Sequence, residues 1–119
     1  MLVSLKENSA FRRLYHRGKT AGSRYLVIYC SRNRLGINRY GMTVSTKLGH
    51  AVVRNRMRRR LREICRLNQQ QLKQGYDIVI VARSAAVEAP FAQLTDSFLN
   101  LMDKLSLRRD EAGNESYWP

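Results

Sequence analysis

The sequence predicts a single α+β domain with the element order α-β-β-β-α-β-α. Its 119 residues suffice for one domain with a hydrophobic core, and 44% of them are hydrophobic, which argues against disorder for most of the chain. Segments with apolar residues at every second position alternate with segments of helical period. The pattern stops near residue 108. We therefore expect a domain over residues 1–107 and a mobile tail over residues 108–119.

The first expected helix covers residues 8–16. Phe11, Leu14 and Tyr15 fall within one turn there, and polar residues at the start suit a helix N-cap. Gly18 is the residue expected to end it.

Three strands are expected next, of which the first is a short one near residues 19–21. Residues 25–30 alternate cleanly between two faces, and residues 39–46 form the third strand. The turn between these two longer strands contains Gly36 and Asn38, which we expect to adopt the unusual backbone dihedrals.

A long amphipathic helix is expected from residue 51 to about residue 73, with Gly75 just beyond its end. Its apolar stripe consists of Val53, Met57, Leu61 and Ile64. The opposite side consists of Asn55, Arg59, Arg62 and Arg66, and the flanks of Arg54, Arg56, Arg58 and Arg60.

The last two elements are a strand and a helix. Residues 76–82 form a continuous β-branched run, which is typical of a buried central strand and brings the predicted sheet to four strands. Pro90 suits the first turn of the final helix. The apolar stripe of that helix consists of Phe91, Leu94, Phe98, Leu101, Met102 and Leu105.

Positive charge is concentrated in the first half of the chain. The net charge is +13, and residues 1–66 hold 17 Lys and Arg against two acidic residues, whereas residues 67–119 hold 5 against 7. This asymmetry indicates a binding surface for a polyanion, because general solubility would not require one-sided charge.

The arginine-rich helix is the centre of that charge. A charged face that is merely solvated is the ordinary interpretation, but Arg54/Arg58 and Arg58/Arg62 repel each other at i,i+4. The run uses arginine alone, which suits bidentate contacts with phosphate. We therefore expect a nucleic-acid interface.

The fold pattern favours RNA over DNA. The basic helix lies between two strands, without the second helix of a helix-turn-helix motif and without heptads. Phe11, Tyr15 and Tyr29 are candidates to stack unpaired bases, although aromatic residues at such spacings are more often part of the core.

Catalytic and metal-binding patterns are weak. The two histidines, His16 and His50, would have to converge with a lysine to cleave RNA, and we expect His50 instead to cap the basic helix or contact phosphate. Cys30 and Cys65 lack metal-ligand or disulfide spacing. The first residues lack the apolar run of a signal peptide, so a cytoplasmic protein without a membrane partner is expected.

The segment "VSTKLGHAVVRNRMRRRLREICR" closely resembles the signature of the bacterial ribonuclease P protein family. The resemblance extends upstream to "LKENSAFRRLYHRG" and downstream through "YDIVIVAR", and covers about residues 5–106. It implies an α/β sandwich whose four-stranded mixed sheet contains a left-handed β-α-β crossover. It also implies two RNA partners, the ribonuclease P RNA and precursor tRNA. The RNA would remove the 5′ leader of precursor tRNA with its own Mg²⁺ ions, and the protein would contribute no catalytic residue and no metal site.

The resemblance also implies two sets of binding residues. Phe11, Tyr15 and Tyr29 would line a cleft for the single-stranded leader. The set facing the catalytic RNA would be Lys47, Arg54, Asn55, Arg56, Arg58, Arg59 and Arg62. Two positions depart from the family pattern: His50 replaces a common Asn, and Arg60 replaces a common apolar residue. Arg60 lies at the edge of the apolar stripe, where its long side chain would snorkel rather than bind RNA.

Three rival functions remain open at this stage. A structural RNA-binding protein would bind RNA without stimulating tRNA maturation. A DNA-binding regulator would prefer duplex with a defined site. A self-sufficient nuclease would cut RNA unaided and would depend on His16 or His50.

Overall fold

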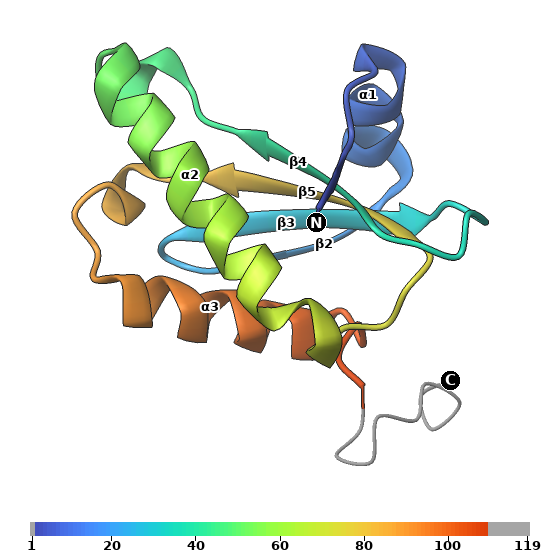
Figure 1. Ribbon diagram of the computed structural model, residues 1–119. Helices are drawn as coiled ribbons and strands as arrows, with labels where there is room; N and C mark the ends of the chain where they lie inside the picture. The colour runs from blue at the N-terminus through green and yellow to red at the C-terminus, as the bar shows by residue number, and fades with distance from the viewer. Residues whose placement is uncertain (1, 110–119) are drawn as a thin grey trace.

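A five-stranded mixed sheet with the order β1-β4-β5-β3-β2 forms the centre of the structure, a computed structural model that describes residues 2–109 (Figure 1). The strands are β1 (Val3–Ser4), β2 (Lys19–Gly22), β3 (Leu26–Arg32), β4 (Arg39–Thr43) and β5 (Tyr76–Ala82). The helices are α1 (Asn8–Arg17), α2 (Ala51–Asn68) and α3 (Phe91–Lys104), with short 3₁₀ turns at Thr46–Leu48, Gln69–Gln71 and Ser84–Ala86.

The helices cover the sheet unequally. In Figure 1, α2 and α3 lie against one face and α1 lies against the other. The larger core lies under α2 and α3, where apolar residues of β3 and β5 such as Ile28 and Ile80 are fully buried. The smaller core joins α1 to the opposite face through Leu5, Leu14 and Val79. The α+β order of the longer elements is as the sequence predicts, because both periodicities reflect faces that are buried.

The strand count differs from the prediction. The sheet has a fifth strand, β1, which pairs in parallel with β4 through Val3 and Ser4. Leu5 N–H also donates to the Tyr40 carbonyl at 2.8 Å. A two-residue strand is too short to show a periodic pattern, and β1 is held by backbone hydrogen bonds to β4, which is distant in the sequence. The prediction of four strands was therefore wrong.

Strands β4 and β5 are parallel neighbours and are connected through α2, which makes a β-α-β unit. This connection brings the amino end of α2 close to the carboxyl end of β4. The left-handed sense of the crossover, which the resemblance implies, stays a prediction.

The helix α2 ends five residues before the predicted limit. It stops at Asn68, whose side-chain amide donates to the Ile64 carbonyl at 2.8 Å. The chain then turns through a 3₁₀ segment so that Lys73 N–H donates to the Leu107 carbonyl at 2.7 Å. Residues 71–72 thereby pair with residues 108–109, the beginning of the predicted tail. The remainder of that tail lies outside the described residues.

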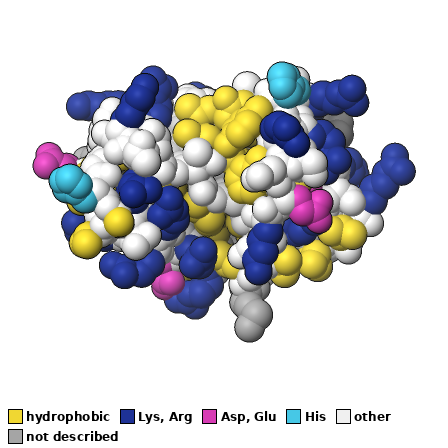
Figure 2. All heavy atoms as spheres, turned by 90° about the horizontal axis from the view of Figure 1, so that it is seen from above, with side chains coloured by type: hydrophobic (Ala, Val, Ile, Leu, Met, Phe, Trp, Pro, Cys, Tyr) yellow, Lys and Arg dark blue, Asp and Glu magenta, His cyan; other side chains and the backbone are white. Residues whose placement is uncertain are grey.

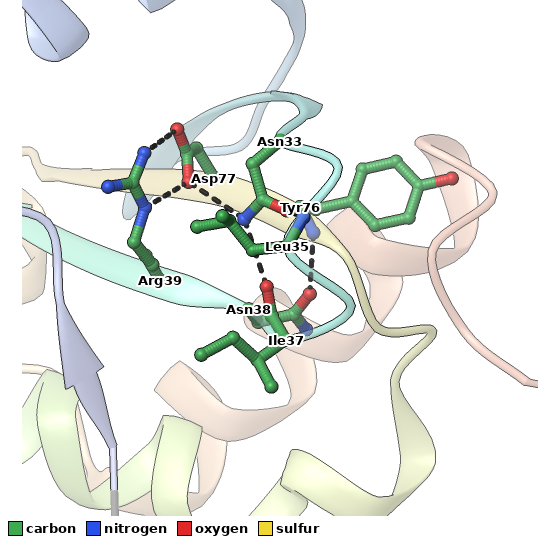
Figure 3. A network of polar contacts seen from close by, with 7 residues as sticks. All are labelled: Asn33, Leu35, Ile37, Asn38, Arg39, Tyr76 and Asp77. Carbon is green, nitrogen blue, oxygen red and sulfur yellow. Dashed lines mark hydrogen bonds and ion pairs between the residues drawn. The ribbon is translucent and has the colours of Figure 1, made fainter.

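A polar network fixes the turn between β3 and β4 (Figure 3). The Asn33 amide donates to the Ile37 carbonyl at 2.9 Å and to Asp77 Oδ1 at 3.0 Å. Arg39 donates two hydrogen bonds to the Asp77 carboxylate, each 2.8 Å long. Burial by itself would raise the pKa of Asp77, but the hydrogen bonds and the charge of Arg39 hold that pKa below its usual value.

The same turn corrects one predicted conformation. Gly36 does adopt a positive φ of 76°, but the second such residue is Arg34, with φ of 63°, rather than Asn38. Asn38 is buried instead. Its carboxamide accepts from Tyr76 N–H at 2.9 Å and donates to the Lys73 carbonyl at 2.8 Å, so it joins the turn to β5.

Two further side chains differ from their predicted environment. Phe91 is 37% exposed at the first residue of α3, so it does not belong to the apolar stripe of that helix. Gly75 has the positive φ expected of it, 98°, but it precedes β5 and does not cap α2.

Both cysteines are buried free thiols, and burial raises the pKa of Cys30 to about 11, which keeps it protonated.

Candidate nucleic-acid interface

The helix α2 presents its arginines away from the core. Met57, Leu61 and Ile64 are buried against the sheet and α3, whereas Val53 at the amino end is only partly buried. The polar side chains of α2 that this docking leaves exposed are Asn55, Arg56, Arg59, Arg62 and Arg66. The predicted stripe is therefore confirmed from Met57 onward, and α2 is docked by one side only.

The charge of this surface is not balanced within the described residues. The described ion pairs are Arg39–Asp77, Arg66–Glu63 and Arg108–Asp103, so Arg66 is the α2 arginine that has a carboxylate partner. The arginines at positions 54, 56, 58, 59 and 62 have no carboxylate partner in residues 2–109. An excess of fixed positive charge on one helix favours a polyanionic partner.

Three arginines on the flanks of α2 have distinct local roles. Arg54 Nε donates to the Gly49 carbonyl at 3.2 Å, and Arg58 Nη1 donates to Asn55 Oδ1 at 2.9 Å. Arg60 donates to the Ala89 carbonyl, and desolvation by burial lowers its pKa. Arg60 was expected to snorkel from the edge of the stripe, but its guanidinium instead turns toward the backbone of the segment before α3. That Arg60 does not bind RNA stays a prediction.

Two residues predicted to contact RNA or phosphate, Lys47 and His50, lie just before the amino end of α2. Lys47 is exposed in the 3₁₀ turn that Ser45 begins, where the Ser45 hydroxyl accepts from Lys47 N–H at 3.1 Å. His50 occupies the N-cap position of α2, but its side chain makes no capping hydrogen bond. Of the two roles expected for the His50 side chain, capping the helix was therefore wrong, and contact with phosphate stays a prediction.

The three predicted leader-cleft aromatics form one cluster between α1 and the sheet. The Tyr15 and Tyr29 rings meet edge to face with centroids 5.0 Å apart, and Phe11 and Tyr15 are 6.4 Å apart. The Tyr15 hydroxyl shares a hydrogen bond of 2.8 Å with Thr43 Oγ1 on β4. Tyr15 remains 40% exposed while its orientation is fixed. A fixed and exposed ring is suited to stacking an unpaired base.

Gly41 allows Phe11 to lie directly on the sheet. A Cβ at Gly41 would approach Phe11 Cε1 to 2.8 Å and Cζ more closely still. Any larger residue at this position of β4 would therefore displace the ring. The position of Phe11 thus depends on a glycine 30 residues away in the chain.

Phe11 and Tyr15 line a cleft of about 560 Å³, whereas Tyr29 contacts the Tyr15 ring but is not part of the lining. Its lining combines residues of α1, of the carboxyl end of β4 and of α2: Asn8, Phe11, Arg12, Tyr15, Met42, Thr43, Val44 and Arg58. Figure 2 shows hydrophobic side chains gathered in the middle of this face of the molecule, with Lys and Arg side chains on both sides. Apolar surface between two cationic borders fits a strand that has bases and phosphates.

The sequence interpretation missed several residues of this cleft. Arg12 lies four residues after Asn8 and three before Tyr15, so helical spacing alone would have placed it on the same face. A glycine inside a strand also indicates that another group packs closely on the backbone there, as Phe11 does on Gly41. Arg58 was assigned to the helix surface, and the structure shows that it borders the cleft as well.

Within residues 2–109, no group of three or more His, Cys, Asp and Glu side chains is arranged to hold a metal ion. The described helices also include none that is long and apolar enough to cross a membrane. The cleft lining contains no histidine and no carboxylate, so the groups that it offers are aromatic rings, guanidinium groups, hydroxyls and amides.

The family model for ribonuclease P matches residues 2–106. The chain belongs to the ribonuclease P family. Among the similar relatives, the ribonuclease P protein component of Caldanaerobacter subterraneus subsp. tengcongensis is 44% identical over 110 residues, which is 92% of this chain and 95% of the relative. The component of Alkaliphilus oremlandii is 41% identical over 103 residues, 87% of this chain and 90% of the relative.

Solved structures of ribonuclease P proteins have the same fold. The Staphylococcus aureus protein matches with a TM-score of 0.81 and 29% identity over 90% of this chain and 98% of its own. The Thermotoga maritima protein matches with a TM-score of 0.79 and 28% identity over 85% and 96%. The resemblance seen around the arginine helix is thereby confirmed for nearly the whole domain.

Proposed function

We propose that the chain is the protein subunit of a ribonuclease P and assists the removal of the 5′ leader from precursor tRNA. In this proposal the exposed arginine face of α2 binds the catalytic RNA. The cleft between α1 and the sheet holds the single-stranded leader. Membership of the ribonuclease P family supports the subunit role.

The adjacency of the two regions is the observation that carries the proposal. Arg58 belongs to α2 and lines the cleft together with Phe11 and Tyr15. Catalytic RNA on α2 and a leader in the cleft would therefore be held side by side by one rigid protein. A phosphate that joins the two regions would be neutralised by Arg58 and Arg12, which reduces the repulsion between the RNAs.

The protein's own contribution is binding and positioning. Phosphate contacts on α2 supply affinity and register with little sequence reading. Stacking in the cleft accepts any base, since every base has a π-face. We assign the hydrolysis and the Mg²⁺ ions that support it to the RNA subunit, and we propose that the complex acts in the cytoplasm.

The direct test is cleavage of a precursor tRNA by a bacterial ribonuclease P RNA at low Mg²⁺, with and without this protein. The proposal predicts strong stimulation by the protein and no cleavage by the protein alone. Tight RNA binding without stimulation would instead leave a structural RNA-binding protein. Cleavage by the protein alone that is lost in His16→Ala or His50→Ala would indicate a self-sufficient nuclease.

A further inference from the structure

A second cationic pocket, here called the edge pocket, lies between β3, the amino end of β5, and the carboxyl ends of α1 and α3. Its volume is about 360 Å³, within the range of small-ligand sites. It is lined by Arg17, Lys19, Cys30, Ser31, Arg32, Tyr76, Leu105, Ser106 and Leu107.

The edge pocket is separate from the interface described above. The edge pocket lies at the paired residues Arg32 and Tyr76, where β5 begins. The leader cleft lies beside Thr43, which pairs with Val81 near the end of β5. Five residues of extended strand separate these positions, or roughly 17 Å. The two linings share no residue.

The floor and wall of the edge pocket suit a flat ring. Cys30, Leu105 and Leu107 are buried and give it an apolar floor. The Arg32 guanidinium carbon lies 5.7 Å from the centre of the Tyr76 ring, in cation–π geometry. A guanidinium over a partly exposed tyrosine is a surface on which nucleobases stack.

The rim of the edge pocket suits a phosphate. Arg17 and Lys19 add two exposed cations to Arg32, and none of the three forms an ion pair within residues 2–109. No acidic residue lines the pocket. Ser31 and Ser106 supply hydroxyls beside these cations, and Ser106 is held with a positive φ of 58° by Ser106 N–H donating to the Asp103 carbonyl at 3.0 Å.

We propose that the edge pocket binds one unpaired nucleotide of an RNA strand, with its base against Tyr76 and Arg32 and its phosphate at Arg17 and Lys19. This inference rests on the proposed function for the nature of the partner, which is RNA. The nucleotide comes from either the catalytic RNA or a part of the leader beyond the cleft, and both sources present the same base and phosphate.

The test compares Arg32→Ala with the matched control Arg24→Ala in the full chain. Arg24 is also exposed and lies 5.8 Å from the Tyr25 ring centre, but Asp96 lines its pocket. Each substitution removes one charge and one cation–π contact, and neither side chain makes a hydrogen bond within residues 2–109. Tyr76→Leu and Tyr76→Phe provide a second pair, because leucine removes the π-face and phenylalanine retains it.

Two affinities are measured for each variant as a function of salt. The first is that of the protein for the ribonuclease P RNA alone. The second is that of the assembled holoenzyme for precursor tRNAs with a leader that fills only the cleft or with a longer one. Arg32→Ala should weaken one of these affinities about fivefold and reduce its salt slope by about 0.7 relative to Arg24→Ala. Tyr76→Leu should show the loss and Tyr76→Phe should not.

The outcomes separate the sources and the two proposals. A loss with ribonuclease P RNA alone assigns the nucleotide to the catalytic RNA, and a loss confined to longer leaders assigns it to the leader. Arg32→Ala and Arg24→Ala behaving alike in both assays, with the unsubstituted protein binding normally, would overturn the edge pocket and leave the proposed function intact. Failure of the unsubstituted protein to bind either RNA would overturn both.

Discussion

The arginine face of α2 and the aromatic cleft beside α1 are built in opposite ways. The arginine face needs only a docked helix: buried Met57, Leu61 and Ile64 hold α2, and the charged side chains extend into solvent. The cleft needs exact packing, because Phe11 lies on Gly41 and the Tyr15 hydroxyl bonds to Thr43.

This difference has consequences for sensitivity. Charge–phosphate contacts act over about a Debye length and are weakened by salt, but they tolerate small shifts of a flexible side chain. Stacking has little dependence on salt but requires the ring to be in place. We therefore expect substitutions in the two regions to fail in different assays.

The largest effect is expected from removing two exposed cations of α2. Arg59→Ala combined with Arg62→Ala should weaken binding to ribonuclease P RNA about 10- to 100-fold, since each charged contact contributes about 1 kcal/mol or more. The slope of log affinity against log salt should fall by about 1.4 to 1.8. A filter-binding titration across salt concentrations measures both. Arg66→Ala is the matched control because Arg66 pairs with Glu63, and an unchanged slope in the double variant would reject α2 as the binding face.

A more selective effect is expected from the cleft aromatics. Phe11→Ala or Tyr29→Ala should leave assembly with the RNA unchanged and weaken holoenzyme binding of leader-bearing precursor about 5- to 150-fold, the value of one stacked base. Binding of mature tRNA should not change. Phe91→Ala controls for the loss of a partly exposed ring elsewhere. Equal losses for precursor and mature tRNA would remove the cleft assignment.

A smaller effect is expected when the ring is displaced but retained. Gly41→Ala should destabilise the fold by about 1–3 kcal/mol through overpacking against Phe11 and should weaken leader binding severalfold. Denaturant unfolding and precursor binding measure the two effects. Gly22→Ala is the matched control, because the nearest atom to its added Cβ is 3.6 Å away. Identical behaviour of the two variants would show that Phe11 does not depend on Gly41.

The smallest effect on RNA binding is expected at Asp77, which fixes the turn between β3 and β4 at the other end of the sheet from the cleft. Its pKa is lower in the folded than in the unfolded state, so the charged carboxylate stabilises the fold fully above the unfolded pKa, and this stability is lost as the pH falls below about 4. Asp77→Asn should remove this part of the acid sensitivity and cost about 1–3 kcal/mol at neutral pH. Asp103→Asn, which breaks an exposed pair with Arg108, should cost less than about 1 kcal/mol. Urea unfolding at several pH values would contradict the account if the two variants were equal.

The sequence predicted the elements that bury a periodic face. The stripe of α2 from Met57 to Ile64 and the buried run of β5 appear as expected, because burial repeats at the helical or strand period. The place of Arg60 at the edge of that stripe was also predicted, but the hydrogen bond of its guanidinium to the Ala89 carbonyl was not. The cleft aromatics were open on pattern alone, and the family resemblance selected them.

Features held by distant backbone contacts were not predictable in this way. Strand β1 exists through its pairing with β4, and α2 ends at Asn68 because the following segment pairs with residues 107–109. Asn38, where a positive φ was expected, is instead buried and bonded to β5 and to the Lys73 carbonyl, and the positive φ falls on Arg34. The sequence around each of these residues does not indicate its partner, because the partner lies far away in the chain.

A double-mutant cycle tests most directly whether the arginine face and the cleft act separately. Arg62→Ala, Tyr29→Ala and the combined variant would be compared for binding of leader-bearing precursor tRNA by the holoenzyme at saturating protein. The account predicts a loss for Tyr29→Ala, little loss for Arg62→Ala once assembly is saturated, and a coupling energy within about 0.5 kcal/mol. A coupling energy well above about 1 kcal/mol would contradict it and would show that the two regions bind RNA as one surface.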